Sequence, residues 1–327
     1  MITSNDTTVS LEYTIHVVRA IPRRIIKHKI QSQTDLARGS YLGLQRMIAA
    51  SHDNDMNDLF EVAAKMGKYF SVKLLLANKR FIPSTCSAAI CLAADNGCLE
   101  IIKLLLADKR IDPSTMNNTA LLFAVQKGHA DIVRLLVTDE RVDPSDNNNY
   151  AIIWASRNGD FEIVRLLLTD ERVDPSAVNN MAIQLASERG RTDVVRMLLT
   201  DKRVDPSIAE NEAIQWASAN GHADVVRLLL VDERVDPSAV DNLAIQLASE
   251  NGYIDVVRLL LTDGRVDPSA TDCLAFQLAA EYGRLDIVRL LLVDGRVDRD
   301  VIIKMMHQIT SICDIEYFDL DTKLQVW

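Results

Sequence analysis

The stretch RVDPSAVNNMAIQLASERGRTDVVRMLLTDK, residues 172–202, decides the fold because near-copies of it recur along the chain. Variants of its first five letters begin at Arg80, Arg110 and Arg296. The unchanged string RVDPS begins every 31 residues, at Arg141, Arg172, Arg203, Arg234 and Arg265. A glycine follows almost the same period, at Gly67, Gly97, Gly128, Gly159, Gly190, Gly221, Gly252 and Gly283. A fixed period of this length indicates a repeat architecture.

One unit of this repeat predicts a pair of short helices. Pro175 has no N–H and restricts the residue before it, so the segment around it is not helical. Asn180 is the expected N-cap of a first helix that runs over about residues 181–188. Gly190, which can take a positive φ, is expected to end that helix. Asp193 then opens a second helix, where a carboxylate complements the helix dipole.

The second helix is apolar on nearly every side. It carries Val194, Val195, Met197, Leu198 and Leu199, which indicates packing against neighbours. Two helices of about two turns each are not stable alone in water, and stacking on copies of themselves stabilises them. The sequence therefore predicts an all-α solenoid.

The repeat resembles the ankyrin family. The family's first helix ends A-A-x-x-G, and residues 186–190 read ASERG. Its second helix has the form [DE]-[IV]-V-[KR]-L-L-L, and residues 220–230 read NGHADVVRLLL. The resemblance implies an ankyrin-type repeat solenoid of about eight helix-turn-helix units with short fingers and helical caps. The short RVDPS-type unit is similar to ankyrin arrays of amoebae, other protists and giant viruses.

The chain also departs from the family pattern. Its units are shorter than the family's usual length of about 33 residues, so we expect short fingers. The family's T-P-L-H start is replaced by an Asn cap followed by Ala. A glutamine stands where the family's histidine bridges loops, and its amide is expected to do similar work, at Gln184, Gln215, Gln246 and Gln277.

The pattern divides the chain into three parts. Residues 1–55 form an N-terminal segment with a degenerate cap, in which residues 36–50 retain a weak repeat pattern. Residues 56–299 form the ankyrin repeat array. Residues 300–327 form a C-terminal part, in which helical spacing of apolar residues predicts a capping helix over 300–312. The tail after it either folds back, is disordered, or serves as a docking peptide.

Composition narrows the class of protein. No stretch is long and apolar enough to cross a membrane, and no signal peptide is evident, so we expect a soluble cytoplasmic protein. A net charge of −10 argues against a nucleic-acid partner. A basic run lies within residues 19–29. It is interpreted as a solvated segment, with contact to an acidic partner or a membrane surface as the alternative.

Five cysteines without a C-x-x-C pair do not indicate a disulfide framework. Cys86, Cys91 and Cys98 cluster in the sequence. We interpret them as small buried residues, with a metal site as the less favoured alternative.

The sequence shows no catalytic signature, so we expect no enzyme, no cofactor, no metal and no small-molecule substrate. The catalytic and nucleotide-binding motifs H-E-x-x-H, G-x-S-x-G, the P-loop and G-x-G-x-x-G do not occur. His129 and His222 follow a repeat glycine, where the family often has a structural histidine. Trp154 and Trp216 are expected in the core.

Second-helix arginines recur three residues after a helix-start carboxylate, at Arg134, Arg165, Arg196, Arg227, Arg258 and Arg289. Pairing with that carboxylate is the expected role. Recognition of phosphates or acidic peptides is the alternative.

The resemblance implies that another protein binds across the fingers and the concave face of the first helices. Positions that vary between units mark that face, and Tyr150, Met181, Leu243 and Tyr282 are expected to be exposed anchors. The predicted partner-binding residues are Asn147, Tyr150, Arg157, Val178, Met181, Glu188, Arg189, Glu210, Glu212, Asn220, Val240, Leu243, Glu250, Thr271, Leu274, Glu281 and Tyr282.

The leading hypothesis is therefore a non-catalytic protein-interaction scaffold. The alternative is a substrate adaptor for a ubiquitin ligase, which would need a docking box, and none is recognised in residues 1–50 or 300–327.

Overall fold

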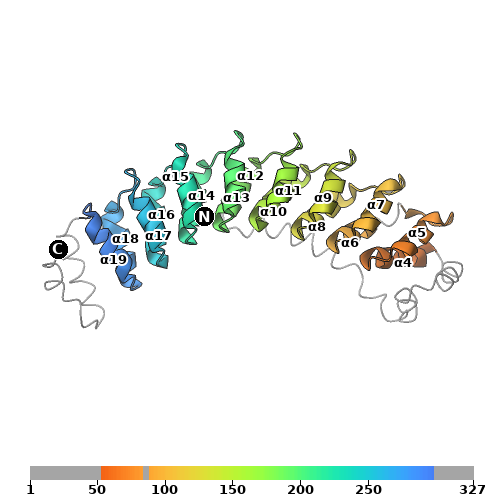
Figure 1. Cartoon of the computed structure of the whole chain (residues 1–327), viewed down its shortest axis with the longest axis horizontal. Coiled ribbons are helices and arrows are strands. Elements are labelled where there is room, and N and C mark those ends of the chain that lie inside the picture. Colours follow the sequence, from red (N-terminus) through yellow and green to blue (C-terminus); the bar gives the residue numbers. More distant parts are fainter. Residues whose placement is uncertain (1–52, 84–87, 298–327) are drawn as a thin grey trace. The chain divides into compact units, whose positions relative to one another are not determined.

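The structure is a computed structural model that describes residues 53–83 and 88–297. Within these residues every regular element is a helix, sixteen in all, and Figure 1 shows them in consecutive pairs. The chain divides into two compact units with the boundary between Asn147 and Asn148. The predicted N-terminal cap, the capping helix over 300–312 and the tail lie outside the described residues, as do the basic run and Cys86.

The first unit contains three helix pairs. They are α4 (Asp53–Lys65) with α5 (Tyr69–Ala77), α6 (Ala88–Asp95) with α7 (Leu99–Ala107), and α8 (Thr115–Gln126) with α9 (Ala130–Val137). First helices pack on first helices, α4 on α6 and α6 on α8, and second helices pack on second helices in the same order.

The second unit contains five helix pairs, and α10 begins two residues before its boundary. They are α10 (Asp146–Asn158) with α11 (Phe161–Leu167), α12 (Ala177–Glu188) with α13 (Thr192–Leu199), α14 (Ile208–Ala219) with α15 (Ala223–Val231), α16 (Ala239–Asn251) with α17 (Ile254–Leu261), and α18 (Ala270–Glu281) with α19 (Leu285–Asp294). Consecutive first helices from α12 to α18 pack together, and so do consecutive second helices from α11 to α19. The all-α helix-turn-helix repeat is confirmed.

Each pair buries the apolar residues that the repeat supplies. In the pair α12–α13, Ala182, Ile183 and Ala186 of the first helix are fully buried, and so are Val195 and Leu198 of the second. Small residues on the first helix allow its neighbours to approach closely, which suits a core with few aromatics. Gly190 has a φ of 66° at the end of α12, as predicted.

Three residues at the start of most first helices lie in the left-handed region. In α12 these are Val178 (φ 53°), Asn179 (φ 56°) and Asn180 (φ 58°), and the right-handed helix begins after them. We call this segment the left-handed turn. It recurs at residues 116–118, 147–149, 209–211, 240–242 and 271–273. Such a conformation costs roughly 1–2 kcal/mol per residue outside glycine, so contacts from the folded repeat must hold it in place.

The asparagine in the third position of the turn supplies one of these contacts. Asn180 was predicted to cap its own helix, and this is wrong: its Oδ1 accepts the N–H of Asp205 in the next repeat at 2.8 Å. Asn180 is itself left-handed, so it belongs to the turn, and its side chain bonds to the next repeat instead of to the N–H groups of its own helix. The same bond joins Asn149 to Asp174, Asn211 to Asp236 and Asn242 to Asp267, each at 2.7 Å.

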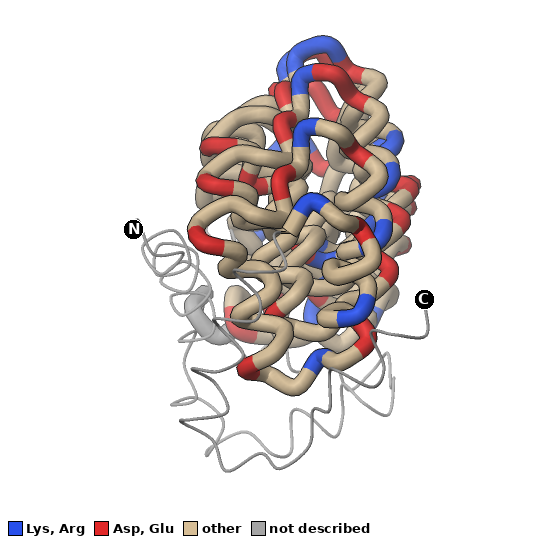
Figure 2. Tube along the Cα trace, turned by 90° about the vertical axis from the view of Figure 1, so that its left-hand side faces the viewer, with Lys and Arg blue, Asp and Glu red and all other residues tan. Residues whose placement is uncertain are grey.

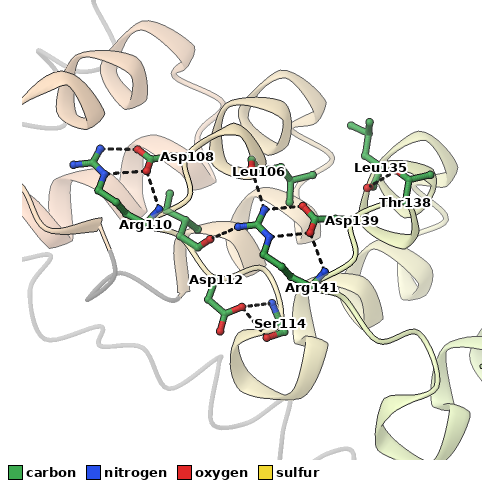
Figure 3. Close-up of polar contacts among 10 residues, drawn as sticks. Leu106, Asp108, Arg110, Asp112, Ser114, Leu135, Thr138, Asp139 and Arg141 are labelled. Atoms are coloured by element: carbon green, nitrogen blue, oxygen red, sulfur yellow. Dashed lines mark hydrogen bonds and ion pairs between the residues drawn. The ribbon is translucent and has the colours of Figure 1, made fainter.

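The arginine of RVDPS also connects neighbouring repeats. Arg203 donates from Nε and Nη2 to Asp201 at 3.0 and 2.7 Å, while Nη1 donates to the carbonyl of Val173 at 2.8 Å. In the first unit Arg141 holds Asp139 in the same way and reaches the carbonyl of Leu106 (Figure 3). The guanidinium lowers the pKa of each partner carboxyl, as for Asp201. The period of this arginine is evident from the sequence, but its role is not.

The arginines of the second helices behave as expected in part. Ion pairs three residues apart join Arg165 to Glu162 at 2.8 Å, Arg289 to Asp286 at 3.3 Å and Arg227 to Asp224 at 3.8 Å. The side chains of these pairs are about half exposed or more, so each contributes little to stability.

Candidate partner-binding surface

In the second unit, two sets of residues on or beside the first helices keep part of their surface accessible. One is the left-handed turn, and the other is the exposed part of each first helix up to the repeat glycine. We call these two sets together the first-helix face. It comprises the turns and accessible helix residues, up to the repeat glycine, of α12, α14, α16 and α18, and of α10 from Asn148 onward. It contains every predicted site residue except Asn147, which belongs to the first unit and donates from Nδ2 to the carbonyl of Asn117 at 2.6 Å.

The predicted site residues of the left-handed turns are at least partly exposed. Val240 retains 44% of its accessible surface, and Glu210 and Thr271 are also exposed, whereas Val178 is half-buried. Glutamine, four residues into the helix, ties the turn in place: Gln215 Nε2 donates to the carbonyl of Glu210 at 2.6 Å. Gln184, Gln246 and Gln277 make the same bond. The expected loop-bridging amide therefore acts within one repeat.

The residue that follows each turn is more buried than expected. Tyr150, Met181 and Leu243 were predicted to be exposed anchors, and all three are half-buried, as are Glu212 and Leu274. Neighbouring first helices pack against one another, as α12 does on α14 and α16 does on α18, and this packing covers part of their opening residues. Burial raises the pKa of the Tyr150 hydroxyl.

The predicted residues before the repeat glycine remain accessible. Tyr282 is 50% exposed, in agreement with its predicted role as an exposed residue. Arg189, Asn220 and Glu281 are exposed. Arg157, Glu188 and Glu250 are half-buried.

The two tryptophans are not core residues, contrary to the sequence-based expectation. Trp216 is 37% exposed, and Trp154 is half-buried with the Arg157 guanidinium 5.0 Å from its ring centroid. Each tryptophan lies four residues after a predicted site residue, Tyr150 or Glu212. Residues four apart share one side of a helix, so this spacing is the signal by which both could have been assigned to the face.

The first-helix face becomes acidic toward the C-terminal end of the array. Figure 2 shows Asp and Glu recurring in successive turns of the tube. Six carboxylates belong to α14, α16 and α18, namely Glu210, Glu212, Asp241, Glu250, Asp272 and Glu281. The same three helices contain no lysine or arginine.

The described residues give no sign of a metal or membrane site. No group of three His, Cys, Asp or Glu side chains within them is arranged to hold a metal ion. None of the helices in this part of the chain has the length and apolar character needed to span a bilayer. Cys91 is fully buried, and this burial raises the pKa of its thiol to about 12. Such a thiol is not a ready nucleophile.

Comparison with known families identifies the repeat. The family model described as ankyrin repeats (3 copies) matches residues 47–148, 90–179, 152–241 and 214–301. The matches cover more than half of the chain. The chain belongs to the ankyrin repeat family. Ankyrin repeats generally mediate protein–protein interaction.

A search of solved structures also finds an ankyrin repeat domain. The crystal structure of the ankyrin repeat domain of Bcl-3, described as a unique member of the IkappaB protein family, is 24% identical with a TM-score of 0.48. The alignment covers 61% of this chain and 97% of that one. No curated protein sequence matches this chain.

Two histidines play the structural role expected of this ankyrin repeat chain. The ring of His222 lies against Gly190 of the preceding repeat, and its Nε2 is 2.9 Å from the carbonyl oxygen of Glu188. His129 packs on Gly97 in the same way in the first unit. Their contacts join consecutive repeats.

Proposed function

We propose that this chain is a non-catalytic scaffold that binds another protein through its first-helix face. The observation that carries the proposal is the accessible apolar surface of the first helices. Trp216 and Tyr282 are exposed, and Tyr150, Met181 and Leu243 are half-buried at the residue that follows the left-handed turn in their own repeats. Aromatic and large apolar residues on a rigid surface supply most of the binding energy at protein interfaces.

The rigidity of the face supports the same function. Side-chain hydrogen bonds hold the left-handed turns and loops in place. An Asn Oδ1 accepts an N–H of the next repeat, a Gln Nε2 donates within its own repeat, and an Arg donates to a carbonyl of the preceding repeat. A preorganised surface loses little conformational entropy on binding. Residues 56–299 are the proposed binding array, between the proposed terminal segments 1–55 and 300–327. A cytoplasmic location is part of this proposal.

The test uses affinity capture by the full chain from its native cells, with quantitative mass spectrometry. Trp216→Ala combined with Tyr282→Ala should reduce capture of the major bound proteins by more than about tenfold, because each such anchor contributes roughly 1–2 kcal/mol at an interface. The matched control is Val231→Ala combined with Val293→Ala. These valines are 80% and 84% exposed and lie in the last turns of the second helices α15 and α19.

Circular dichroism should give the same helicity for both double variants and the wild type. Equal capture by the face variant and the wild type would contradict the proposed surface. Loss of capture only in the valine variant would place binding on the second helices instead.

A further inference from the structure

The first helices α14, α16 and α18 carry acidic residues without basic ones, whereas the second helices α15, α17 and α19 carry both. On the second helices an acidic residue precedes an arginine by three positions, as Asp224 and Arg227 do in α15. In the loops, the aspartate two residues before each RVDPS arginine holds that arginine, as Asp232 holds Arg234 at 2.6 Å. The helices α14, α16 and α18 contain six carboxylates and no basic residue.

These six carboxylates have no ion-pair partner among the described residues. No lysine, arginine or histidine of the described chain lies within ion-pair distance of Glu210, Glu212, Asp241, Glu250, Asp272 or Glu281. Arg284 comes near α16, but its Nε donates to the backbone carbonyl of Glu250 at 3.0 Å. Burial, together with the nearby Glu210, raises the pKa of Glu212, as expected where negative charge is not neutralised.

Partly accessible apolar side chains lie near these carboxylates on the same three helices. Trp216 is 37% exposed and lies one helical turn after Glu212. At the equivalent positions, Leu247 follows Leu243 and Leu278 follows Leu274, and these four leucines are half-buried. A ligand lying across the three helices would therefore meet apolar surface bordered by carboxylates.

We propose that the face of α14, α16 and α18 binds a basic polypeptide segment in which lysines or arginines are separated by apolar residues. This inference rests on the proposed function and adds the chemistry of the partner. Buried apolar contacts supply affinity, and the unpaired carboxylates select positive charge and reject acidic partners. Nucleic acid is excluded as an occupant of this face because its phosphates would meet six carboxylates.

Repeat geometry indicates the spacing of the lysines or arginines in the bound segment. Packed helices lie about 8–10 Å apart, and a polyproline II segment has about three residues per turn and rises about 3.1 Å per residue. A segment that crosses the helices in this conformation would therefore present every third residue, on one side, to the next acidic position.

The experiment measures binding of a fluorescent peptide of five Lys-Leu-Ala triplets to the full chain by anisotropy. The comparison peptides replace every Lys with Glu, or every Leu with Ser. The expected result is that only the Lys-Leu-Ala peptide binds tightly. Its Kd should weaken when salt is raised from about 0.05 M to about 0.5 M, which shortens the screening length.

Two protein variants locate the contact. Glu210→Asn, Asp241→Asn and Asp272→Asn together should weaken binding by about tenfold, as expected for three rim charges. Asparagine already occupies this position of the left-handed turn at Asn117, Asn148 and Asn179, so the backbone is not disturbed. The matched control removes three acids from second helices, with Asp193→Asn, Asp224→Asn and Asp255→Asn, and should bind as the wild type does.

Other outcomes overturn the inference. If the Glu peptide binds equally well and Trp216→Ala abolishes its binding, selection of a basic partner is wrong while the first-helix face remains the proposed site. If both triple variants lose binding equally, the attraction is a general effect of net charge. If the Lys-Leu-Ala peptide does not bind, the partner class is wrong, and the capture experiment with the face variant still decides the proposed function.

Discussion

At the scale of single residues, the buried asparagine of the left-handed turn has the clearest role. Asn211 is 8% exposed, and its Oδ1 accepts the N–H of Asp236 at 2.7 Å. Asparagine suits this position for two reasons. It tolerates the left-handed region better than most residues, and its amide reaches the backbone of the next repeat. In α18 the equivalent residue is Cys273, which has the left-handed backbone without the amide.

Replacing Asn211 with alanine should lower the free energy of unfolding by about 1–3 kcal/mol, because a part-buried hydrogen bond is lost and the N–H of Asp236 is left without its acceptor. Urea unfolding followed by circular dichroism measures this change. The control is Asn220→Ala, an exposed asparagine in the same repeat, which should cost less than about 0.5 kcal/mol. Equal losses for the two variants would contradict the proposed role of the inter-repeat bond.

At the scale of the helix pair, the repeat glycine meets two requirements at once. Gly221 has a φ of 76°, and a Cβ built there would lie 2.4 Å from the ring of Tyr253 in the next repeat. Gly283 has a φ of 68°, yet a Cβ at that position meets nothing within 4 Å. The two positions separate the cost of backbone conformation from the cost of close packing.

Gly283→Ala should destabilise the chain by about 1 kcal/mol, the cost of a left-handed alanine. Gly221→Ala should cost about 1–3 kcal/mol more, because Tyr253 must move as well. Equilibrium unfolding of both variants tests the difference. The steric argument would fail if Gly221→Ala were no more damaging than Gly283→Ala, or if Tyr253→Ala did not reduce the excess cost.

At the scale of the whole molecule, the recurring Asp–Arg pair makes stability depend on pH. Hydrogen bonds from the arginine lower the pKa of the aspartate below its ordinary value of 3.8 in both units, for Asp108, Asp139, Asp170, Asp201, Asp232, Asp263 and Asp294. A carboxyl group whose pKa is lowered by folding stabilises the folded state fully above its unfolded pKa. That contribution is lost as the pH falls through the folded-state pKa.

We therefore expect the urea midpoint to fall steeply as the pH drops below about 4. Near neutral pH these carboxyl groups stay ionised in both states, so they add almost no pH dependence to the midpoint. Asp232→Asn with Asp263→Asn should flatten the acid slope, since two of the titrating groups are then absent. Asp193→Asn with Asp255→Asn, on the second helices, provides the control and should keep the wild-type slope. An unchanged slope in the first double variant would contradict the assignment.

Much of the architecture could be predicted from the sequence because the same physical requirement recurs in every unit. Pro175, Gly190 and the apolar run from Val194 to Leu199 are local signals, and their positions set where each helix can begin and end. The site was predictable in part. Variation between units indicated the first-helix face, and Tyr282 is exposed as expected. The degree of burial of Tyr150 and Met181 depends on how neighbouring turns pack, which no single unit contains.

By itself, the sequence determined the repeat, the helix pairs and the ankyrin family, since these follow from short-range periodicity. Only the tertiary structure decided the left-handed turn, the bond from Asn180 to the next repeat and the exposure of Trp216. The physical reason is the same for all three. Each depends on atoms about one repeat away in sequence, which become neighbours only when the helix pairs stack.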